Sequence, residues 1–268
     1  MFWASLATLR PTEQPSMTDI SVFYNCCDLP GHRNLSLDQM IRFCQSDLST
    51  EAKNVYVMLN GNLTEFLDLA RLLENNLNVR IVHTNPDAKL MEWPGLMHLK
   101  HYCDSLDTEE YVMYFHLKGV THPYNPGIRD WRRYLEYWNI DRWRDCVALL
   151  DQGHDTVGTN FINEPFVGAD QQPRNWNHYS GNFWWARGSY IQRLESLPHP
   201  HSYVTGTTSQ LTGYTIDHNN YYRFDHEAWI ASGKPNFAEI DCTLGSNRIA
   251  GGYPGWHYHH TYPESNYK

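Results

Sequence analysis

The stretch Tyr111-Val-Met-Tyr-Phe-His-Leu-Lys-Gly119 decides the fold. Its first five residues form an unbroken apolar and aromatic run, typical of a strand buried on both faces of a mainly parallel sheet. The run then changes abruptly to His116, Lys118 and Gly119. Ligands of open α/β sheets bind beyond the carboxyl ends of the strands, so these residues are well placed for chemistry. A strand end that simply turns to solvent would show the same change.

The residues before this stretch alternate between strand-like and helix-like segments. The predicted strands are residues 20–25, 54–59 and 78–83, and the predicted helices are residues 37–48, 64–75 and 96–106. This alternation predicts βαβ units with right-handed crossovers, and therefore a half-Rossmann arrangement up to Gly119. The GxGxxG turn of dinucleotide-binding sites is missing. A single nucleotide can still bind at the strand ends without that turn.

The residues after Gly119 are less regular. A loop at 121–127 leads into a predicted helix at 128–150, whose stripe of tryptophans and leucines is typical of a core-facing surface. Further predicted elements are a short strand at 155–160, an aromatic strand at 180–187, a helix at 188–197, an irregular region at 198–220 and a short helix or turn at 221–230. No clear linker divides the chain into two domains.

Composition fits one large α/β domain. The chain has 268 residues, of which 41% are hydrophobic and 14% aromatic, which is enough to bury a full core. Residues 1–16 are predicted to be a flexible tail, and residues 17–268 a single domain. The formal charge of −9 and the absence of a basic run argue against nucleic acid as a partner. No apolar run is long enough to predict a membrane span.

The six cysteines are scattered and form no CxxC pair of the kind found in zinc and redox sites. Several of them lie inside predicted apolar elements. Free thiols in a reducing compartment are therefore expected, which predicts a cytoplasmic location.

Three pieces of the sequence, taken in order, resemble a known family. They are Phe115-His-Leu-Lys-Gly119 followed by Trp131-Arg132, then His178-Tyr-Ser-Gly-Asn-Phe-Trp-Trp-Ala186, then Phe224-Asp-His-Glu-Ala-Trp-Ile230. Together they resemble nucleotide-sugar glycosyltransferases of the GT-A type, close to the rhamnan-synthesis F proteins and the glycosyltransferases encoded by chlorella viruses. The resemblance covers roughly residues 20–230, and its second piece is the most specific.

This resemblance implies a GT-A-like single domain with a mainly parallel central sheet flanked by helices. Residues 17–125 would form the nucleotide-sugar-binding part and residues 126–268 the acceptor and catalytic part. The implied activity is transfer of a sugar from a nucleoside diphosphate donor, such as a UDP-sugar, to a glycan acceptor, with inversion. Glycan or polysaccharide synthesis in a virus or bacterium is the implied setting.

The donor is expected at the carboxyl ends of the first strands. The expected donor-binding residues are Asn25, Cys26, Asn60, His116, Lys118, Gly119 and Arg132. GT-A enzymes usually carry an Asp-x-Asp at the end of the fourth strand, where it holds a divalent metal against the sugar diphosphate. Here that position is His116-Leu-Lys118, and a protonated lysine can pair with a diphosphate directly.

The sequence therefore favours metal-independent transfer and predicts no firm cofactor. A divalent metal (Mn or Mg) stays possible, because His257 and His259 near the end of the chain could supply imidazoles. Both are weak candidates, since histidines next to aromatic residues more often belong to the surface or the core.

The catalytic base is expected in Asp225-His-Glu227, after the Gly-Asn-Phe-Trp-Trp string. Inverting transferases of this fold use a carboxylate near a helix start to take the proton of the acceptor hydroxyl. Two residues apart on a helix do not share a face, so one of Asp225 and Glu227 is expected to act. We favour Glu227, with Asp225 as the cap of the helix. The structural alternative is that Asp225 caps the helix and Glu227 pairs with Arg223.

The acceptor is expected beside the aromatic strand. The expected acceptor-binding residues are Tyr179, Gly181, Asn182, Trp184 and Trp185. Aromatic rings suit stacking on the apolar faces of sugars, although one of the two tryptophans should pack against the sheet, because neighbours on a strand point opposite ways.

Two other functions stay open from the sequence. One is a binding protein for a carbohydrate or nucleotide sugar that has this fold but has lost catalysis together with the Asp-x-Asp. The other is a histidine-metal hydrolase, which is weaker because no HExxH or equivalent spacing is present.

Overall fold

A computed structural model of the chain describes residues 18–74, 78–162, 166–167, 173–174, 176–216, 223–241 and 264–267. The predicted tail at 1–16, together with Cys242, His257 and His259, lies outside these residues. Within the described part of the chain, no helix is long and apolar enough to cross a membrane.

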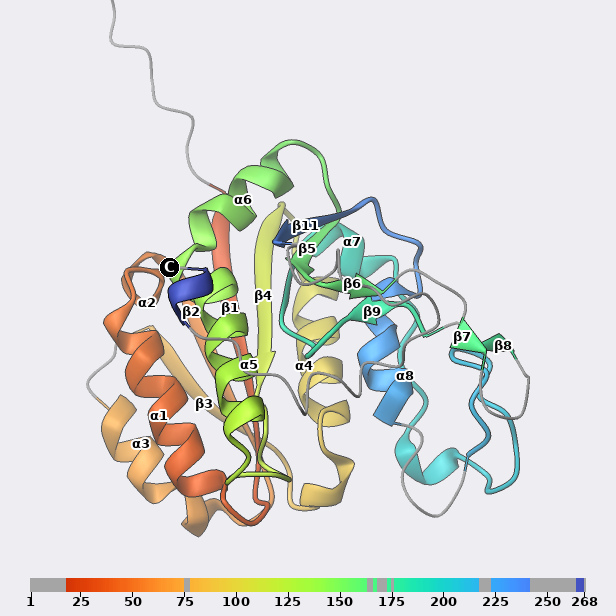
Figure 1. Ribbon diagram of the computed structural model, residues 1–268, viewed down its shortest axis with the longest axis horizontal. Helices are drawn as coiled ribbons and strands as arrows, with labels where there is room; N and C mark the ends of the chain where they lie inside the picture. The colour runs from red at the N-terminus through yellow and green to blue at the C-terminus, as the bar shows by residue number, and fades with distance from the viewer. Residues whose placement is uncertain are drawn as a thin grey trace, which may run out of the picture.

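The described part of the chain is built around one seven-stranded sheet (Figure 1). The strand order is β11-β5-β10-β4-β1-β2-β3. The strands are β1 (Asp19–Cys27), β2 (Asn54–Asn60), β3 (Val79–Asn85), β4 (Glu110–His116), β5 (Thr156–Thr159), β10 (Trp184–Arg187) and β11 (Phe237–Asp241). The first four are mutually parallel, β10 runs antiparallel to both of its neighbours, and β11 is parallel to β5. The predicted α/β fold with a mainly parallel sheet is confirmed.

The four strands predicted in the first half are all present. Each lies within one or two residues of its predicted bounds, and β1 lies between β2 and β4, as in a half-Rossmann unit. In the register, Asn25 lies opposite His116 of β4 and Met58 of β2. The carboxyl ends of β1 and β4 therefore meet at one edge of the sheet.

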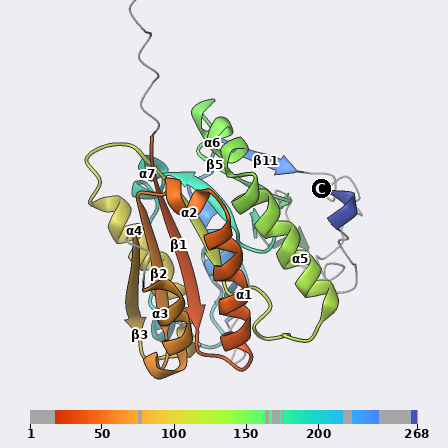
Figure 2. The same cartoon turned by 90° about the vertical axis from the view of Figure 1, so that its left-hand side faces the viewer.

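Helices cover both faces of this sheet, which explains the continuous apolar run of β4. Met113 and Phe115 belong to one core cluster, and Val112 and Tyr114 belong to the other. The first cluster lies under α1 (His32–Gln45), α3 (Leu67–Leu73), α5 (Pro126–Glu136) and α6 (Trp143–Asp151). The second lies under α4 (Trp93–Asp104) and α7 (Gly188–Gln192). Figure 2 shows α4 on one side of the sheet, with α1 and α5 on the other.

Several short elements complete this first half. They are α2 (Leu48–Glu51), η1 (Leu63–Phe66) and η2 (Ala88–Leu90). The helix predicted at 37–48 begins five residues earlier, at His32, where Gly31 adopts a φ of 92° and turns the chain into α1.

The single helix predicted at 128–150 is wrong, because the structure interrupts it. A π-helical segment, η3 (Tyr137–Asp141), separates α5 from α6. Inside it, the Asn139 side chain donates to the Leu135 carbonyl at 2.9 Å, and the Asn139 carbonyl accepts from the Trp185 indole at 3.0 Å. The break thus depends on a tryptophan of β10, which helix periodicity alone does not reveal.

The second half departs further from the predicted elements. The aromatic strand at 180–187 begins at Trp184, because Gly181 and Asn182 both have positive φ and form a turn. The helix at 188–197 ends at Gln192, and β11 was not predicted. The remaining elements are α8 (Arg223–Ala228), η4 (Pro200–Ser202), η5 (Trp229–Ala231), η8 (Glu264–Asn266), and the two-stranded pairs β6 (Phe161–Ile162) with β9 (His178–Tyr179) and β7 (Phe166–Val167) with β8 (Pro173–Arg174).

Candidate functional site

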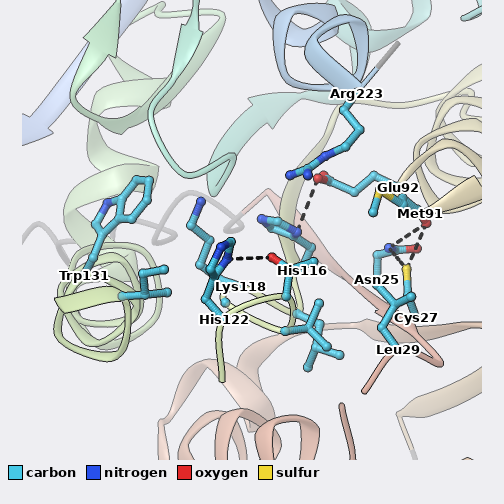
Figure 3. Close-up of a pocket in the computed structure, with 15 residues that line it drawn as sticks. Asn25, Cys27, Leu29, Met91, Glu92, His116, Lys118, His122, Trp131 and Arg223 are labelled. Carbon is cyan, nitrogen blue, oxygen red and sulfur yellow. Dashed lines mark hydrogen bonds and ion pairs between the residues drawn. The ribbon is translucent and has the colours of Figure 1, made fainter. Parts of the chain in front are cut away.

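A polar pocket lies at the carboxyl ends of β1 and β4 (Figure 3). Its lining comes from the ends of these strands, the turn before α4, the loop after β4, α5 and the start of α8. The side chains that can carry chemistry are Asn25, Cys27, Glu92, His116, Lys118, His122 and Arg223. This is the position where open α/β sheets bind their ligands.

Asn25 and Asn60 form the floor of the pocket. The Asn60 amide donates to Asn25 Oδ1 at 3.1 Å and to the Met91 carbonyl at 2.6 Å. The Asn25 amide and the Cys27 thiol donate to the same carbonyl, each at 3.2 Å. These bonds hold the turn before α4 in place, and Met91 has a φ of 51° there. The strand ends therefore fix the backbone that presents Glu92.

Gly95 allows α4 to lie directly against this floor. A Cβ on Gly95 would lie 2.4 Å from Asn25 Oδ1, which is an impossible separation. The close approach explains why a glycine occupies the first turn of α4.

Glu92 and His116 form a buried pair. Glu92 Oε2 accepts from the Tyr114 hydroxyl at 3.0 Å and the Asn182 amide at 2.6 Å. Its Oε1 lies 3.3 Å from Nδ1 of His116. The other ring nitrogen, Nε2, lies 3.1 Å from the Gly181 carbonyl, which can only accept, so Nε2 carries a proton.

A second proton must lie between Nδ1 and Oε1, because two lone pairs facing each other would repel. Burial lowers the pKa of His116 to about 3 and raises the pKa of Glu92, so burial disfavours the charged form of each side chain. With one proton shared between Nδ1 and Oε1, the pair carries no net charge, whichever atom holds that proton.

Lys118 supplies a positive charge to the pocket. Its ammonium lies 3.8 Å from the centre of the Trp131 ring. In the described part of the chain, no carboxylate lies within the 4.0 Å of an ion pair with it. Burial lowers the pKa of Lys118 to about 8, against the opposing effect of Glu227 and Glu92. The side chain is therefore mostly charged at pH 7, with its hydrogen-bond donors unused.

Arg223 supplies a second positive charge from the opposite wall. It is the first residue of α8 and is exposed, and Figure 3 shows its guanidinium above Glu92 and His116. Glu227 follows one turn later, so the two side chains lie on the same side of α8. Among the described residues, no ion pair joins Arg223 and Glu227. The Glu227 carboxylate lies 4.0 Å from Nε2 of His178 instead. The two cations, Lys118 and Arg223, and the one carboxylate, Glu227, together carry one excess positive charge.

Asp225 contacts the 203–216 loop and not Lys118, Arg223 or Glu227. Its carboxylate accepts from the hydroxyls of Ser209 at 2.7 and 2.8 Å, Thr212 at 2.7 Å and Tyr203 at 2.8 Å. Only 2% of Asp225 is exposed. The residue therefore ties α8 to the 203–216 loop.

Of the residues predicted to bind a donor, the structure gathers four at the pocket. Asn25, His116, Lys118 and Gly119 line it, and Asn60 lies directly beneath Asn25. Cys26 points into the core on the other face of the sheet, because neighbours on β1 alternate. Arg132 does not line the pocket, since it lies on α5 and pairs with Asp38 of α1 at 2.9 Å.

The residues predicted to bind an acceptor lie mostly beneath the surface. Trp184 and Trp185 are fully buried, one in each core cluster, so the expectation that one of them faces a ligand is wrong for this structure. Tyr179 is also fully buried, and its hydroxyl bonds to Thr156. Gly181 and Asn182 are near the pocket, but they hold His116 and Glu92 in place.

Sequence reasoning missed Glu92, His178 and Arg223. Glu92 precedes a helix within an irregular turn, where periodicity gives no signal. His178 begins the segment 178–186 that resembles the glycosyltransferases, and Arg223 lies one helical turn before Glu227. These positions offered a weak signal that both residues belong to the site.

A divalent metal does not fit the strand-end pocket. Hard cations prefer free carboxylate oxygens. Among the described residues of the lining, the one carboxyl, Glu92, has partners on both oxygens, and His116 has both ring nitrogens engaged. The Cys27 thiol donates to the Met91 carbonyl, and Nδ1 of His122 bonds to Thr121, so the described lining presents no set of free carboxylates. His257 and His259 lie outside the described residues.

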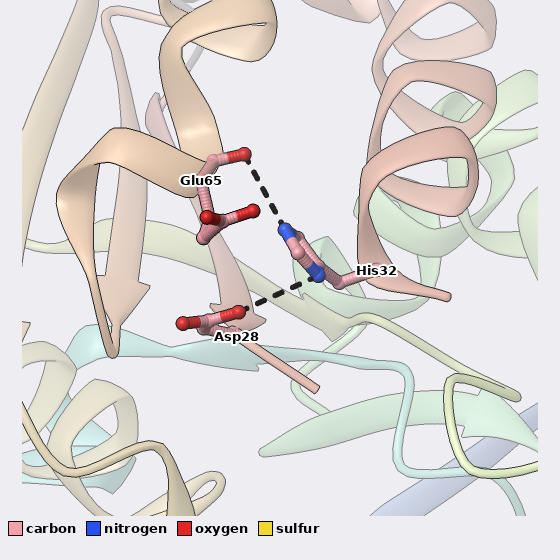
Figure 4. A group of neighbouring side chains, drawn as sticks. All are labelled: Asp28, His32 and Glu65. Carbon is pink, nitrogen blue, oxygen red and sulfur yellow. Dashed lines mark hydrogen bonds and ion pairs between the residues drawn. The ribbon is translucent and has the colours of Figure 1, made fainter. Parts of the chain in front are cut away.

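A second group of potential ligands, Asp28, His32 and Glu65, lies between α1 and η1 (Figure 4). Both ring nitrogens of His32 face carbonyl oxygens, of Leu29 at 2.8 Å and of Glu65 at 3.4 Å. Glu65 also pairs with Arg33 at 3.0 Å. The imidazole has no nitrogen directed at a shared ligand position, so we interpret the group as a link between the two segments.

Comparison with protein families finds a match over most of the chain. The model of a domain of unknown function, DUF8361, matches residues 32–251, and the chain belongs to this family. The match includes the part of the strand-end pocket from Met91 to Arg223, but Asn25, Cys27 and Leu29 precede it. A comparison with curated proteins finds no match.

Proposed function

We propose that the chain is a GT-A-type glycosyltransferase that transfers a sugar from a nucleoside diphosphate donor to a glycan acceptor with inversion. The observation that carries the proposal is the pair of cations, Lys118 and Arg223, at the carboxyl ends of β1 and β4. The donors of both side chains are unused in the described part of the chain. A diphosphate is the ligand chemistry that matches two cations in such a pocket.

The sheet supports the same proposal. The order β3-β2-β1-β4, followed by the antiparallel β10, fits a nucleotide-binding half joined to a second half that contributes α8. The neutral Glu92–His116 pair keeps a negative charge out of the donor side. A charged Glu92 there would repel the diphosphate.

The chemistry is a direct displacement. The acceptor oxygen forms a bond to the anomeric carbon while the bond from that carbon to the diphosphate oxygen breaks. The hydroxyl proton passes to Glu227, and the electron pair leaves with the nucleoside diphosphate, whose added charge Lys118 and Arg223 stabilise. Both cations are side chains of this chain, so the step needs no metal at the strand-end position.

The test is incubation with a panel of nucleotide sugars, followed by mass spectrometry of the products. A working site should release nucleoside diphosphate and free sugar slowly, because water can replace the acceptor. Binding of a nucleotide sugar without any release would favour the binding protein of the same fold. No binding of any member of the panel would contradict both. Addition of EDTA should leave the release unchanged.

A further inference from the structure

His178 and Glu227 place two hydrogen-bond acceptors face to face. Nδ1 of His178 lies 2.7 Å from the Trp176 carbonyl, which only accepts, so Nδ1 carries the proton of the ring. Burial lowers the pKa of His178, so the ring is neutral. Its Nε2 therefore presents a lone pair, and this atom lies 4.0 Å from Oε2 of Glu227.

The imidazole is held in this orientation. The Trp176 ring stacks on it with a centroid separation of 4.2 Å and an interplanar angle of 19°, and Phe224 packs edge-on against that tryptophan. His178 is 2% exposed. A rotation that hides Nε2 would break both the stack and the Nδ1 hydrogen bond.

Neither acceptor has a donor in the described part of the chain. His178 Nε2 and the Glu227 carboxylate make no hydrogen bond there, and the Glu227 side chain is 19% exposed, so the pair opens toward the surface. The two acceptors meet at the edge of the surface without a protein donor among the described residues, which makes this pair a position for a ligand that donates twice.

We infer that the acceptor substrate presents two neighbouring hydroxyl groups, one donating to Glu227 and the other to Nε2 of His178. This inference rests on the proposed function. A single hydroxyl carries one hydrogen and satisfies one acceptor, whereas hydroxyls on adjacent carbons satisfy both. An ammonium ligand could also donate twice, but Lys118 and Arg223 would repel it.

The role of His178 is then to select the acceptor. The hydroxyl on Glu227 is the one that attacks, and the hydroxyl on His178 fixes its direction. A site built to hydrogen-bond a hydroxyl discriminates strongly against the analogue that lacks it. Removal of the neighbouring hydroxyl should therefore lower kcat/KM by a factor of about 100 or more.

The experiment uses the full chain with the donor found in the hydrolysis panel. Acceptor probes are methyl hexopyranosides and the same compounds with one hydroxyl removed. For the best probe, we expect loss of the hydroxyl next to the new bond to lower kcat/KM about 100-fold. The His178→Asn variant keeps an amide donor for Trp176 but has no acceptor at the Nε2 position. It should use the intact and deoxygenated probes equally well.

Two further variants serve as controls. His178→Gln can place an amide oxygen near the Nε2 position and should recover part of the discrimination. His101→Phe replaces an exposed histidine of α4 and should keep all of it. Every variant should keep the affinity of the parent chain for the nucleoside diphosphate, measured by calorimetry, which also shows that each one folds.

Equal use of the intact and deoxygenated probes by the parent chain would overturn the inference. In that case water, and not a second hydroxyl, would occupy the position between His178 and Glu227. Retained discrimination in His178→Asn would overturn it as well. Both results leave donor hydrolysis, and with it the proposed function, in place. Failure of the parent to hydrolyse any donor would contradict the proposed function instead.

Discussion

At the scale of single residues, the pocket depends on where protons are held. Lys118 replaces the carboxylate that a metal-binding strand end would carry, and its ammonium rests on Trp131 instead of pairing with a carboxylate. The Glu92–His116 pair carries no net charge when one proton is shared between Nδ1 and Oε1, which lie 3.3 Å apart. The positive charge that faces a ligand therefore comes from Lys118 and Arg223 alone among these side chains.

Replacement of Lys118 by Ala should weaken binding of a nucleoside diphosphate by about 10- to 100-fold, which corresponds to roughly 1.4–2.8 kcal/mol. Arg at this position should not restore affinity, because a point charge and a planar fork differ in reach and in the direction of their donors. Calorimetry with the nucleotide measures both variants. Lys234→Ala, at an exposed position, is the matched control. Unchanged affinity in Lys118→Ala would refute the cationic account.

Binding of the diphosphate should also depend on pH through Lys118, whose pKa burial lowers to about 8. Below this pH the ammonium is present and attracts the anion; above it the neutral amine does not. The affinity should therefore fall as pH rises through about 8, by at most about tenfold per pH unit. Calorimetry between pH 6.5 and 9.5 should show the fall in the parent chain and not in Lys118→Ala. The same slope in both would assign the titration to another group.

At the scale of elements, the part of the fold that could be predicted is the part set by local pattern. Buried apolar runs identified β1 to β4, and the polar residues after β4 pointed to the pocket. The break within 128–150 could not be predicted, since its Asn139 carbonyl bonds to Trp185 of a distant strand, a contact that local pattern does not reveal. The burial of both Trp184 and Trp185 could not be predicted either, because helices on the two faces of β10 cover one each.

The 203–216 loop depends on α8 through Asp225, the residue we expected to cap that helix. Replacement of Asp225 by Ala would leave three hydroxyls without their charged acceptor. We expect the free energy of unfolding to fall by about 2–4 kcal/mol. Urea denaturation measures the change, and limited proteolysis should cut the loop faster. Asp68→Ala, which removes an exposed pair with Arg71, should change stability by less than about 0.5 kcal/mol.

At the scale of the whole molecule, the proposed reaction needs both halves of the chain. The strand ends of the first half bring Lys118, and α8 of the second half brings Arg223 and Glu227. Direct displacement requires the base on the face of the sugar opposite the leaving diphosphate. The charge of Glu227 opposes the effect of burial on the pKa of Lys118, although no ion pair joins the two in the described part of the chain.

Glu227→Gln should separate the two halves of the reaction. The amide keeps the shape of the side chain but cannot take the acceptor proton, so transfer should fall by about 10²- to 10⁴-fold. Donor binding should change little, because Lys118 and Arg223 remain. Calorimetry with the nucleotide and a transfer assay measure the two quantities on the same preparation. Glu195→Gln, at an exposed position, should leave both unchanged. Near-normal transfer by Glu227→Gln would remove the base from this position, and Asp225 could not replace it while its carboxylate stays engaged with Ser209, Thr212 and Tyr203.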